Sequence, residues 1–374
     1  MDRLLNLRGG QVNARIAAAL MILAIALVAT ACGDDRATKV TRNGNDLVVA
    51  PFTGQLTDVD ERPIAVAAGE GGVWATSMAG GVLTKIDPAT GKTVGKPTAT
   101  DDAPYAVDAA FGKVWVAAFQ NDKLIQVDPE SRKVIKTTKV ANRPFGLTHG
   151  FGSMWVTSIR NETVSRIDPE TGEEIGDPIQ LDGPPYKIAT GFGYVWVTNI
   201  RDGEVVKIDP KTNKLAGEPI AIGARKCSEI PVPNPLKPAP LVNCGAPSAI
   251  TAAGRYLWVA NLRGKALVKG QGTPTQIKQS IPNGEVWKID PKSGKAVGDP
   301  IPVPIRPQAI AGDDTNVWVV SLGANAITRI DTRTGVRDKL PIDISGQPTD
   351  VALGFGRAWF SLSSDDQIAA LENK

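Results

Sequence analysis

The chain of 374 residues has one histidine, three cysteines and few aromatic side chains (5%), which narrows the chemistry open to it. After residue 31 no nucleophile–base motif, metal-ligand spacing or phosphate-binding loop is present. The chain also has no large excess of positive or negative charge. Removing residues 1–31 takes away Arg3, Arg8, Arg15 and Asp2 and leaves 39 basic against 38 acidic side chains. A near-neutral chain exerts no bulk attraction on nucleic acid. We therefore predict no catalytic residue, no metal site and no cofactor, and we do not expect nucleic acid as a partner.

The first 31 residues follow the pattern of a targeting segment. The three arginines precede an apolar run from Ile16 to Val28, which is short against the roughly 20 residues of a membrane span. Small residues, Ala29-Thr30-Ala31, then lead to Cys32. This ending resembles the lipobox of bacterial lipoproteins, with Ala29 where the usual pattern prefers leucine. The resemblance implies cleavage before Cys32 and acylation of its sulfur and new amino group. The alternative is an ordinary secretory signal followed by an unrelated cysteine.

Both interpretations predict export, and lipidation predicts attachment to the outer face of the cytoplasmic membrane. Residues 32–46 are polar and show no periodicity, so we expect the lipidated Cys32 to be followed by a flexible tether. The remaining residues, 47–374, are then expected to form the folded domain.

The folded part contains a unit that recurs from about residue 63 onward. Each copy has a tryptophan at the same position of the unit: Trp74, Trp115, Trp155, Trp196, Trp258, Trp318 and Trp359. The intervals between them are 41, 40, 41, 62, 60 and 41 residues. Abundant glycine (38) and proline (28) suit short strands joined by tight turns, and units of about 40 residues with four strand-like segments are typical of propeller blades. We predict an all-β fold, a seven-bladed β-propeller of four-stranded blades.

The clearest copy shows the four strands of one blade. Its first strand begins at Pro185, the second is Val195–Thr198 and the third is Val205–Ile208, which an Asp-Pro turn connects to the fourth. The last copy of the unit ends without a fourth strand. We expect either Leu47–Phe52 or Gln55–Val59 to supply it, which would close the ring and leave no exposed edge.

The segment Val195-Trp196-Val197-Thr198-Asn199 and its copies resemble the YVTN-type repeat, and the whole unit is similar to the propellers grouped with streptogramin (virginiamycin B) lyase. The resemblance covers residues 47–372 and implies the propeller fold. It also implies two alternative functions, a metal-dependent C–O lyase and a propeller that binds single-stranded nucleic acid. The family's lyase chemistry is associated with histidine and a divalent metal on the propeller face. Because His149 is the single histidine and is expected near the opposite face, no catalytic residue is transferred to this chain.

The residues that the copies share are expected to be structural. The tryptophans lie mid-strand, where side chains pack between blades. Six aspartates precede turns in which a carboxylate accepts backbone N–H bonds: Asp87, Asp128, Asp168, Asp209, Asp290 and Asp331. They fall on separate blades, too far apart to share an ion. We expect His149, at the end of a first strand, to be a packing residue and not a catalytic group.

Two intervals depart from the repeat, and both fall at the fifth blade. From Asp209 to Trp258 there are 49 residues instead of 27 or 28, which places an insertion at about 224–246. From Trp258 to Asp290 there are 32 instead of 13, which places a second insertion at about 264–283. In an up-and-down blade both loops leave the same face, so we expect the insertions to lie side by side on it.

The first insertion contains two cysteines, Cys227 and Cys244. Two cysteines that bound one loop of an exported protein are most simply interpreted as a disulfide. A redox-active pair is the alternative, although no Cys-x-x-Cys motif is present. We therefore predict a structural disulfide between them.

The same face is expected to carry arginines and aromatic side chains around the mouth of the central channel. They flank the proline that opens a blade or lie in loops between second and third strands. The candidate ligand-binding residues are Arg62, Tyr105, Arg143, Phe145, Arg160, Tyr186, Arg201, Arg263 and Arg306. This mixture favours an anionic or aromatic ligand or a protein partner, unless neighbouring acidic residues make it merely a solvated rim. We predict a monomeric, non-catalytic binding or scaffold protein.

Overall fold

The computed structural model describes residues 38–42, 45–100, 103–223, 225–226, 242–262, 265–266 and 284–374. Throughout these ranges the chain forms strands and turns without a helix, within one compact unit, Thr38–Lys374. The described part accordingly has no helix that is long and apolar enough to span a membrane. The targeting segment and Cys32, with the expected lipid anchor, lie outside the described residues.

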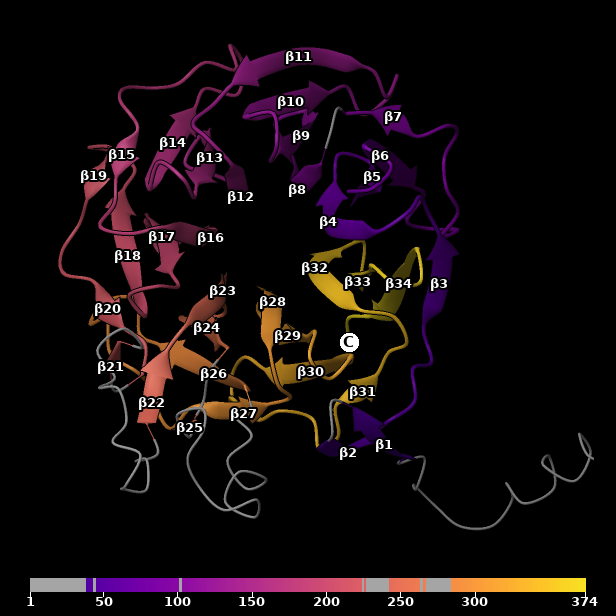
Figure 1. Cartoon of the computed structure of the whole chain (residues 1–374), viewed down its shortest axis with the longest axis vertical. Coiled ribbons are helices and arrows are strands. Elements are labelled where there is room, and N and C mark those ends of the chain that lie inside the picture. The colour runs from indigo at the N-terminus through magenta and orange to yellow at the C-terminus, as the bar shows by residue number, and fades with distance from the viewer. Residues whose placement is uncertain are drawn as a thin grey trace, which may run out of the picture. The chain divides into compact units, whose positions relative to one another are not determined.

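Seven antiparallel sheets are arranged around a common centre as the blades of a propeller (Figure 1). From the centre outward, blade 1 has β4 (Pro63–Gly69), β5 (Gly72–Ser77), β6 (Val82–Ile86) and β7 (Thr98–Ala99). Blade 2 has β8 (Pro104–Ala110), β9 (Lys113–Ala118), β10 (Lys123–Val127) and β11 (Val134–Lys139). Blade 3 has β12 (Pro144–Gly150), β13 (Ser153–Ser158), β14 (Thr163–Ile167) and β15 (Ile179–Gln180). Blade 4 has β16 (Pro185–Gly191), β17 (Tyr194–Asn199) and β18 (Glu204–Asp209), which pairs with both β19 (Lys214–Leu215) and β20 (Ile220–Ala221).

The remaining three blades follow the same order. Blade 5 has β23 (Pro247–Ala253), β24 (Tyr256–Asn261), β26 (Gly284–Ile289) and β27 (Ile301–Val303). Blade 6 has β28 (Pro307–Gly312), β29 (Asn316–Ser321), β30 (Ala326–Asp331) and β31 (Ile342–Asp343). Blade 7 has β32 (Pro348–Gly354), β33 (Arg357–Leu362), β34 (Gln367–Glu372) and β3 (Gln55–Asp58). The innermost strands of neighbouring blades contact one another all round the ring, and β32 contacts β4. The predicted all-β, seven-bladed propeller is confirmed.

The ring is closed by a strand from the N-terminal end of the described chain. Strand β3 pairs antiparallel with β34, with Gln55 opposite Ala370 and Asp58 opposite Gln367. From β3, the buried Thr57 hydroxyl donates to the carbonyl oxygen of Gly91 in blade 1 at 2.6 Å. Of the two closing segments expected from the sequence, the one at residues 55–59 is confirmed.

The chain before β3 forms a hairpin of β1 (Thr38–Arg42) and β2 (Asn45–Val49). Directly after it, Ala50 bridges to Ile342 at the outer edge of blade 6, through backbone hydrogen bonds of 2.9 and 2.7 Å. The structure therefore differs from the tether expected over residues 32–46, since residues 38–42 are paired and belong to the compact unit. Their backbone groups find partners in the apolar stretch that follows, which the polarity of the segment itself does not reveal.

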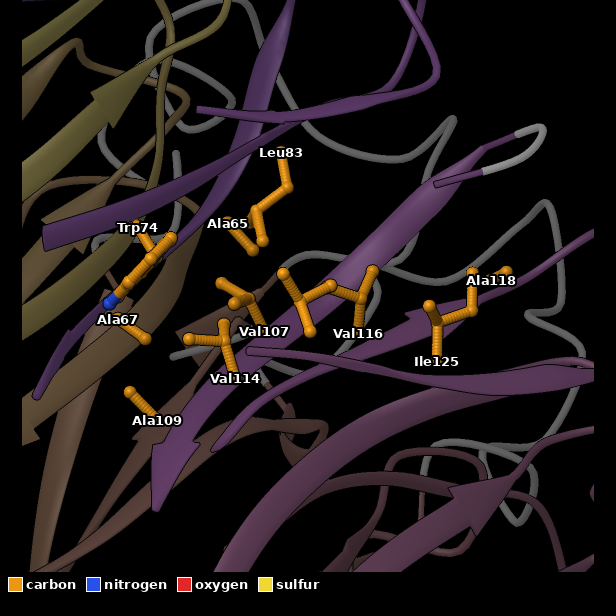
Figure 2. Packing of buried hydrophobic residues seen from close by; sticks show 11 residues of the cluster. Ala65, Ala67, Trp74, Leu83, Val107, Ala109, Val114, Val116, Ala118 and Ile125 are labelled. Atoms are coloured by element: carbon orange, nitrogen blue, oxygen red, sulfur yellow. The ribbon is translucent and has the colours of Figure 1, made fainter. Parts of the chain in front are cut away.

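The hydrophobic core is divided into seven clusters, one at each interface between blades. Between blades 1 and 2, Trp74 and Leu83 of one blade pack with Val114 and Val116 of the next (Figure 2). The seven repeat tryptophans expose at most 2% of their surface. Burying an indole removes on the order of 200 Å² from water, which stabilises the fold by about 5 kcal/mol. The packing role predicted for the tryptophans is confirmed.

Basic side chains lie over several of these tryptophans and reach the next blade. Lys85 stands opposite Trp74 in the ladder, with its Nζ 5.0 Å from the ring centroid, and donates to the carbonyl oxygen of Pro129 in blade 2 at 2.9 Å. Arg166 repeats the arrangement 5.2 Å from Trp155 and donates to the corresponding carbonyl of blade 4 at 2.7 Å. A cation–π contact of this kind is worth about 0.5–2 kcal/mol. The basic side chains thus add a hydrogen bond to the apolar contact between neighbouring blades.

Each of the six repeated aspartates closes its own turn, as predicted. The Oδ1 atom of Asp168 accepts the backbone N–H groups of Glu170 and Thr171, both at 2.8 Å. The other five accept equivalent bonds from residues two or three positions later. Hydrogen bonds from the turn, for Asp128 first from the Ser131 hydroxyl, lower the pKa of five of these carboxyls: Asp87, Asp128, Asp168, Asp290 and Asp331.

Trp318 is held differently from the other six. In those blades the indole N–H donates to the carbonyl oxygen five residues earlier, at 3.0 or 3.1 Å. Trp318 Nε1 donates instead to Asn373 Oδ1 at 2.7 Å, and Asn373 Nδ2 donates to Asp313 Oδ2 at 2.5 Å. Asp313 stands where the other blades have glycine or alanine. The C-terminal end of the chain thus completes blade 6.

We predict that Asn373→Ala leaves the buried Trp318 N–H unpaired and lowers the free energy of unfolding by about 1–3 kcal/mol. Chemical denaturation followed by circular dichroism measures this difference. In a Trp318→Phe background the same change should cost less, because no indole donor is left to satisfy and only the bonds of Asn373 to Asp313 and Asn316 are lost. Lys374→Ala is the matched control, since the hydrogen bonds of Lys374 to blade 6 use its backbone carbonyl. An Asn373→Ala variant as stable as the parent would contradict this role.

Candidate functional site

The loops between second and third strands and the loops between blades leave the propeller on one side, here named the loop-bearing face. Both insertions belong to it, and their described parts form a small sheet of β21 (Arg225–Lys226), β22 (Val242–Gly245) and β25 (Lys265–Ala266) (Figure 1). Strand β22 of the first insertion pairs with β21 and with β25 of the second. The side-by-side arrangement predicted for the insertions is confirmed. Cys227 lies outside the described residues, so its disulfide with Cys244 stays a prediction.

Four of the candidate arginines are exposed on this face, and no ion pair to them is found in the described part of the chain: Arg62, Arg143, Arg160 and Arg306. Three of them, Arg62, Arg143 and Arg306, directly precede blade-opening prolines and have φ angles of 55°, 58° and 56°. The carbonyl of each accepts a backbone N–H from the end of the second strand of its blade, which holds this turn in place. The backbone of these three arginines is therefore held in place at the start of each blade.

Two other candidate arginines differ. Arg201 is already neutralised, with Nη1 at 3.2 Å from Glu162 Oε1 and Nε at 3.5 Å from Asp202 Oδ2. Arg263 lies outside the described residues. Around Arg201 the face is thus a solvated mixture of opposite charges, which is the alternative that the sequence left open. Around the other four described arginines no such pairing is found.

The candidate aromatic residues form a continuous stack across blades 2, 3 and 4. The ring centroids of Tyr105 and Phe145 are 4.3 Å apart, and those of Phe145 and Tyr186 are 4.4 Å apart. Phe119 adds to the stack at 5.6 Å from Tyr105, and the Arg143 guanidinium lies 5.4 Å from the Phe119 ring. Burial raises the pKa of the Tyr105 and Tyr186 hydroxyls. The structure brings together three predicted aromatics and one predicted arginine.

A cavity of about 360 Å³ occupies the channel at the centre of the ring. Its wall comes from the inner strands of all seven blades, mainly from the second to the fifth residue after each opening proline. Alanine, glycine, threonine and aliphatic residues make up this wall except at Asp108, His149, Lys187 and Asp350. Since the aromatic stack directly follows the prolines, it stands at the loop-bearing mouth of the channel.

Two of the four ionisable residues lie near that mouth. Lys187 and Asp350 are each the second residue after the proline of their strands, in blades 4 and 7. The Lys187 ammonium is 5.7 Å from the centroid of Phe145, and Asp350 Oδ2 accepts the N–H of Val66 at 3.2 Å. Burial raises the pKa of the Asp350 carboxyl, while the positive charge of Lys187 acts in the opposite direction.

The other two form a pair toward the opposite mouth. His149 Nδ1 lies 2.9 Å from Asp108 Oδ2, and 51% of the histidine side chain is exposed. The place of His149 near the opposite face is as expected, and Asp108 satisfies its Nδ1, although the side chain is half exposed at the end of β12; that it is a packing residue and not a catalytic group stays a prediction. The Phe111 ring stands edge-on at 6.1 Å. The hydrogen bond to Asp108 outweighs desolvation and raises the pKa of His149.

The sequence contains a signal for the charged channel residues that position-by-position alignment of the repeats would have revealed. Aligned on the opening proline, the second residue after it is small in the other five blades: Ala65, Ala106, Gly146, Ala249 and Ala309. Lys187 and Asp350 are the two exceptions in this column. The Phe119 contact carries no comparable signal, because it depends on how a loop of blade 2 folds over its neighbour.

The described part of the chain does not fit the divalent metal that the lyase resemblance implies. Among the residues whose placement is given, no three histidine, cysteine, aspartate or glutamate side chains come together as a metal site would require. The pair of His149 and Asp108 supplies two such groups. No reaction step through a metal is therefore derived.

Solved structures of low sequence identity share this fold. A streptogramin B lyase structure matches with a TM-score of 0.63 and 18% identity, over 84% of this chain and 96% of that chain. A catalytically inactive histidine-to-alanine variant of virginiamycin B lyase from Staphylococcus aureus, with quinupristin, matches with a TM-score of 0.63 and 19% identity, over 86% and 99%. Hydrazine synthase from Kuenenia stuttgartiensis matches with a TM-score of 0.68 and 14% identity, over 86% and 99%. No protein-family model and no curated protein matches the sequence. Identities this low show a common fold alone.

We predict that the pKa of His149 lies above its ordinary value of 6.5 and that Asp108→Asn moves it back toward that value. Because the chain has one histidine, the imidazole NMR signal of the tag-free protein is unambiguous. A raised pKa in the folded state means that the pair stabilises the protein below pH 6.5, and that this contribution is lost as the pH rises through the folded pKa. The histidine is half exposed, so the effect on stability should be small.

Glu70→Gln is the matched control for this titration, since Glu70 raises the pKa of His149 less than Asp108 does. It should shift the titration less than Asp108→Asn. Identical titration curves for the parent and the Asp108→Asn variant would show that the two side chains are not paired in solution.

Proposed function

We propose that this protein is a non-catalytic binding scaffold, held at the outer face of the cytoplasmic membrane through Cys32. Its loop-bearing face takes an anionic or aromatic group, presented by a small ligand or by a protein partner. The single observation that carries the proposal is the aromatic stack at the channel mouth, flanked by exposed arginines without ion pairs in the described part of the chain.

The chemistry of this face supports binding. Aromatic rings and guanidinium groups contribute the most per residue at protein interfaces, because they combine large contact area with planar stacking and hydrogen bonding. The stack of Tyr105, Phe145 and Tyr186 is held by neighbouring blades, so little order is lost when a ligand docks on it. Arg143 and Arg306 stand on fixed turns of blades 3 and 6.

The insertions extend the same face at blade 5. The two insertions contribute strands to one small sheet: β21 and β22 come from the first insertion and β25 comes from the second. Pairing of the two insertions gives the face a second element, toward the outer side of blade 5 (Figure 1). Loops that a rigid scaffold positions in this way are common carriers of binding residues.

A photo-crosslinking amino acid at Asn142, exposed beside Arg143, is expected to form adducts in cells that carry the membrane-bound full chain. The same group at Val336, which is 66% exposed on a turn of the opposite face, should form few. The double change Arg143→Ala and Arg306→Ala should lower the adduct yield about tenfold, which corresponds to roughly 1.4 kcal/mol of binding free energy. Adducts are compared by immunoblotting and mass spectrometry.

Thermal melting of each variant controls for folding, and Arg333→Ala, on the opposite face, is the matched charge control. Equal adduct yields at Asn142 and Val336 would refute binding through the loop-bearing face. An adduct yield at Asn142 that is unchanged by the double substitution of Arg143 and Arg306 would refute it as well.

A lyase is the second candidate function. The pair of His149 and Asp108 favours it, because a carboxylate that orients and raises the pKa of an exposed imidazole is a common arrangement of a general base. The fold shared with streptogramin lyases is compatible with this alternative.

Incubation of the purified full chain with quinupristin and magnesium, followed by mass spectrometry, separates the two candidates. The scaffold proposal expects the cyclic compound to stay intact. A ring-opened product that disappears in His149→Ala would establish the lyase and overturn the non-catalytic proposal.

A further inference from the structure

Two opposite charges interrupt a column of small side chains in the channel. At the second position after the opening proline, five blades have alanine or glycine, whereas blade 4 has Lys187 and blade 7 has Asp350. Space in this column is tight: a Cβ added to Gly146 would lie 2.8 Å from the carbonyl oxygen of Tyr186. Packing between inner strands therefore favours small residues here. The two charged side chains are not explained by packing.

Neither charge is matched by a direct partner of opposite sign within the described residues. Lys187 and Asp350 belong to blades that are not neighbours, and no ion pair between them is formed. The Lys187 ammonium stands 5.7 Å from the Phe145 ring, and Asp350 receives the N–H groups of Val66, at 3.2 Å, and Val351; Lys187 acts on it electrostatically without direct contact. A charge withdrawn from water is stabilised only by a close opposite charge or by several hydrogen bonds. The channel thus offers one cationic and one anionic group to an incoming molecule.

Further polar groups converge on the same mouth. No residue of the described chain forms a hydrogen bond with the hydroxyl of Tyr105 or of Tyr186, although burial raises the pKa of both. Asp350 lies near enough to Tyr105, and Arg306 near enough to Tyr186, to affect these pKa values electrostatically. The cavity wall is formed mainly by small and aliphatic residues, and a few polar groups that converge on such a wall are the usual form of a small-molecule site.

We infer that the loop-bearing mouth of the channel binds a small zwitterion, an amino acid or dipeptide whose ammonium group pairs with Asp350 and whose carboxylate pairs with Lys187. Tyr105 and Tyr186 supply additional hydroxyl donors, and the aromatic stack covers an apolar side chain. The cavity of about 360 Å³ is at the small end of ligand sites, which fits a molecule of this size. The inference rests on the proposed function in placing a ligand on the same face, and it names the ligand class and two residues that the rim does not include.

The arrangement discriminates by charge. An amino acid derivative capped at its amine leaves Asp350 without a counter-charge, and one capped at its carboxylate leaves Lys187 without one. Because a desolvated charge without a partner is costly, each capped form should bind less tightly than the free zwitterion. A site that used only the aromatic stack would not distinguish the three forms.

The test uses the purified full chain and a panel of the twenty L-amino acids and their Gly-X dipeptides. A thermal-shift screen selects the best member, and calorimetry then compares it with its N-acetylated form and its C-terminal amide. We expect the free zwitterion to bind at least about tenfold more tightly than either capped form. Lys187→Met should remove the preference over the amide, and Asp350→Asn should remove the preference over the acetylated form.

Asp350→Asn keeps an oxygen that can accept the Val66 N–H, so this variant should fold, and melting without ligand verifies it. Lys292→Met and Asp314→Asn are matched controls, since both residues are exposed on turns of the opposite face. They should leave the affinity unchanged.

The inference is overturned if no panel member raises the melting temperature more than its doubly capped form does, or if the two channel variants keep the charge preference. Retained crosslinking at Asn142 in that case would leave the proposed binding face intact. Conversely, zwitterion binding that depends on Lys187 and Asp350 together with absent rim adducts would uphold the channel site and refute the partner-binding rim.

Discussion

The whole structure depends on one contact repeated seven times, the packing of a blade's tryptophan against the next blade. A single four-stranded blade cannot bury both of its faces, so each blade is stable only between two neighbours. Trp74 illustrates this: it is fully buried, it packs against the second strand of blade 2, and Lys85 lies over its ring and reaches the turn of that blade. Because every interface needs a partner, the ring must close, and β3 closes it from the other end of the sequence. The bond of Asn373 to Trp318 adds a second tie from the chain terminus.

The residues that stabilise the fold are mainly those of the second strands, the interfaces and the aspartate turns. The channel wall shares some of them, since Val107 belongs both to a core cluster and to the cavity lining, but other wall positions have no such packing role. Propellers with 14–20% identity can therefore share the fold without sharing a function. The informative residues are those that break the small-residue column, Lys187 and Asp350, and those that break the polarity of the wall, Asp108 and His149. The inner strands position all four residues at the cavity. What each can bind depends on the groups that face it there.

Much of the fold could be predicted because its determinants are local and periodic. The tryptophan spacing counts the blades, the aspartates mark the turns that they close through their own backbone neighbours, and the lapses in spacing locate the insertions at blade 5. Prediction was weaker where pairing joins distant segments. Two closing strands were compatible with the sequence, and pairing with β34 selects the one that begins at Gln55. Strand β1 falls within the tether expected over residues 32–46, because its stability comes from pairing with β2 and not from the polarity of its own sequence.

The sequence by itself determined the number of blades, the order of their strands, the face that carries the insertions and the identity of the candidate rim residues. Each of these follows from spacing along the chain, which the repeat makes explicit. Only the tertiary structure decided which side chains meet: Tyr105 with Phe145, Asp108 with His149, and Lys187 and Asp350 within one cavity. These residues are about 40 to 160 positions apart and are brought together by ring closure, a property of the assembled blades that no local pattern encodes.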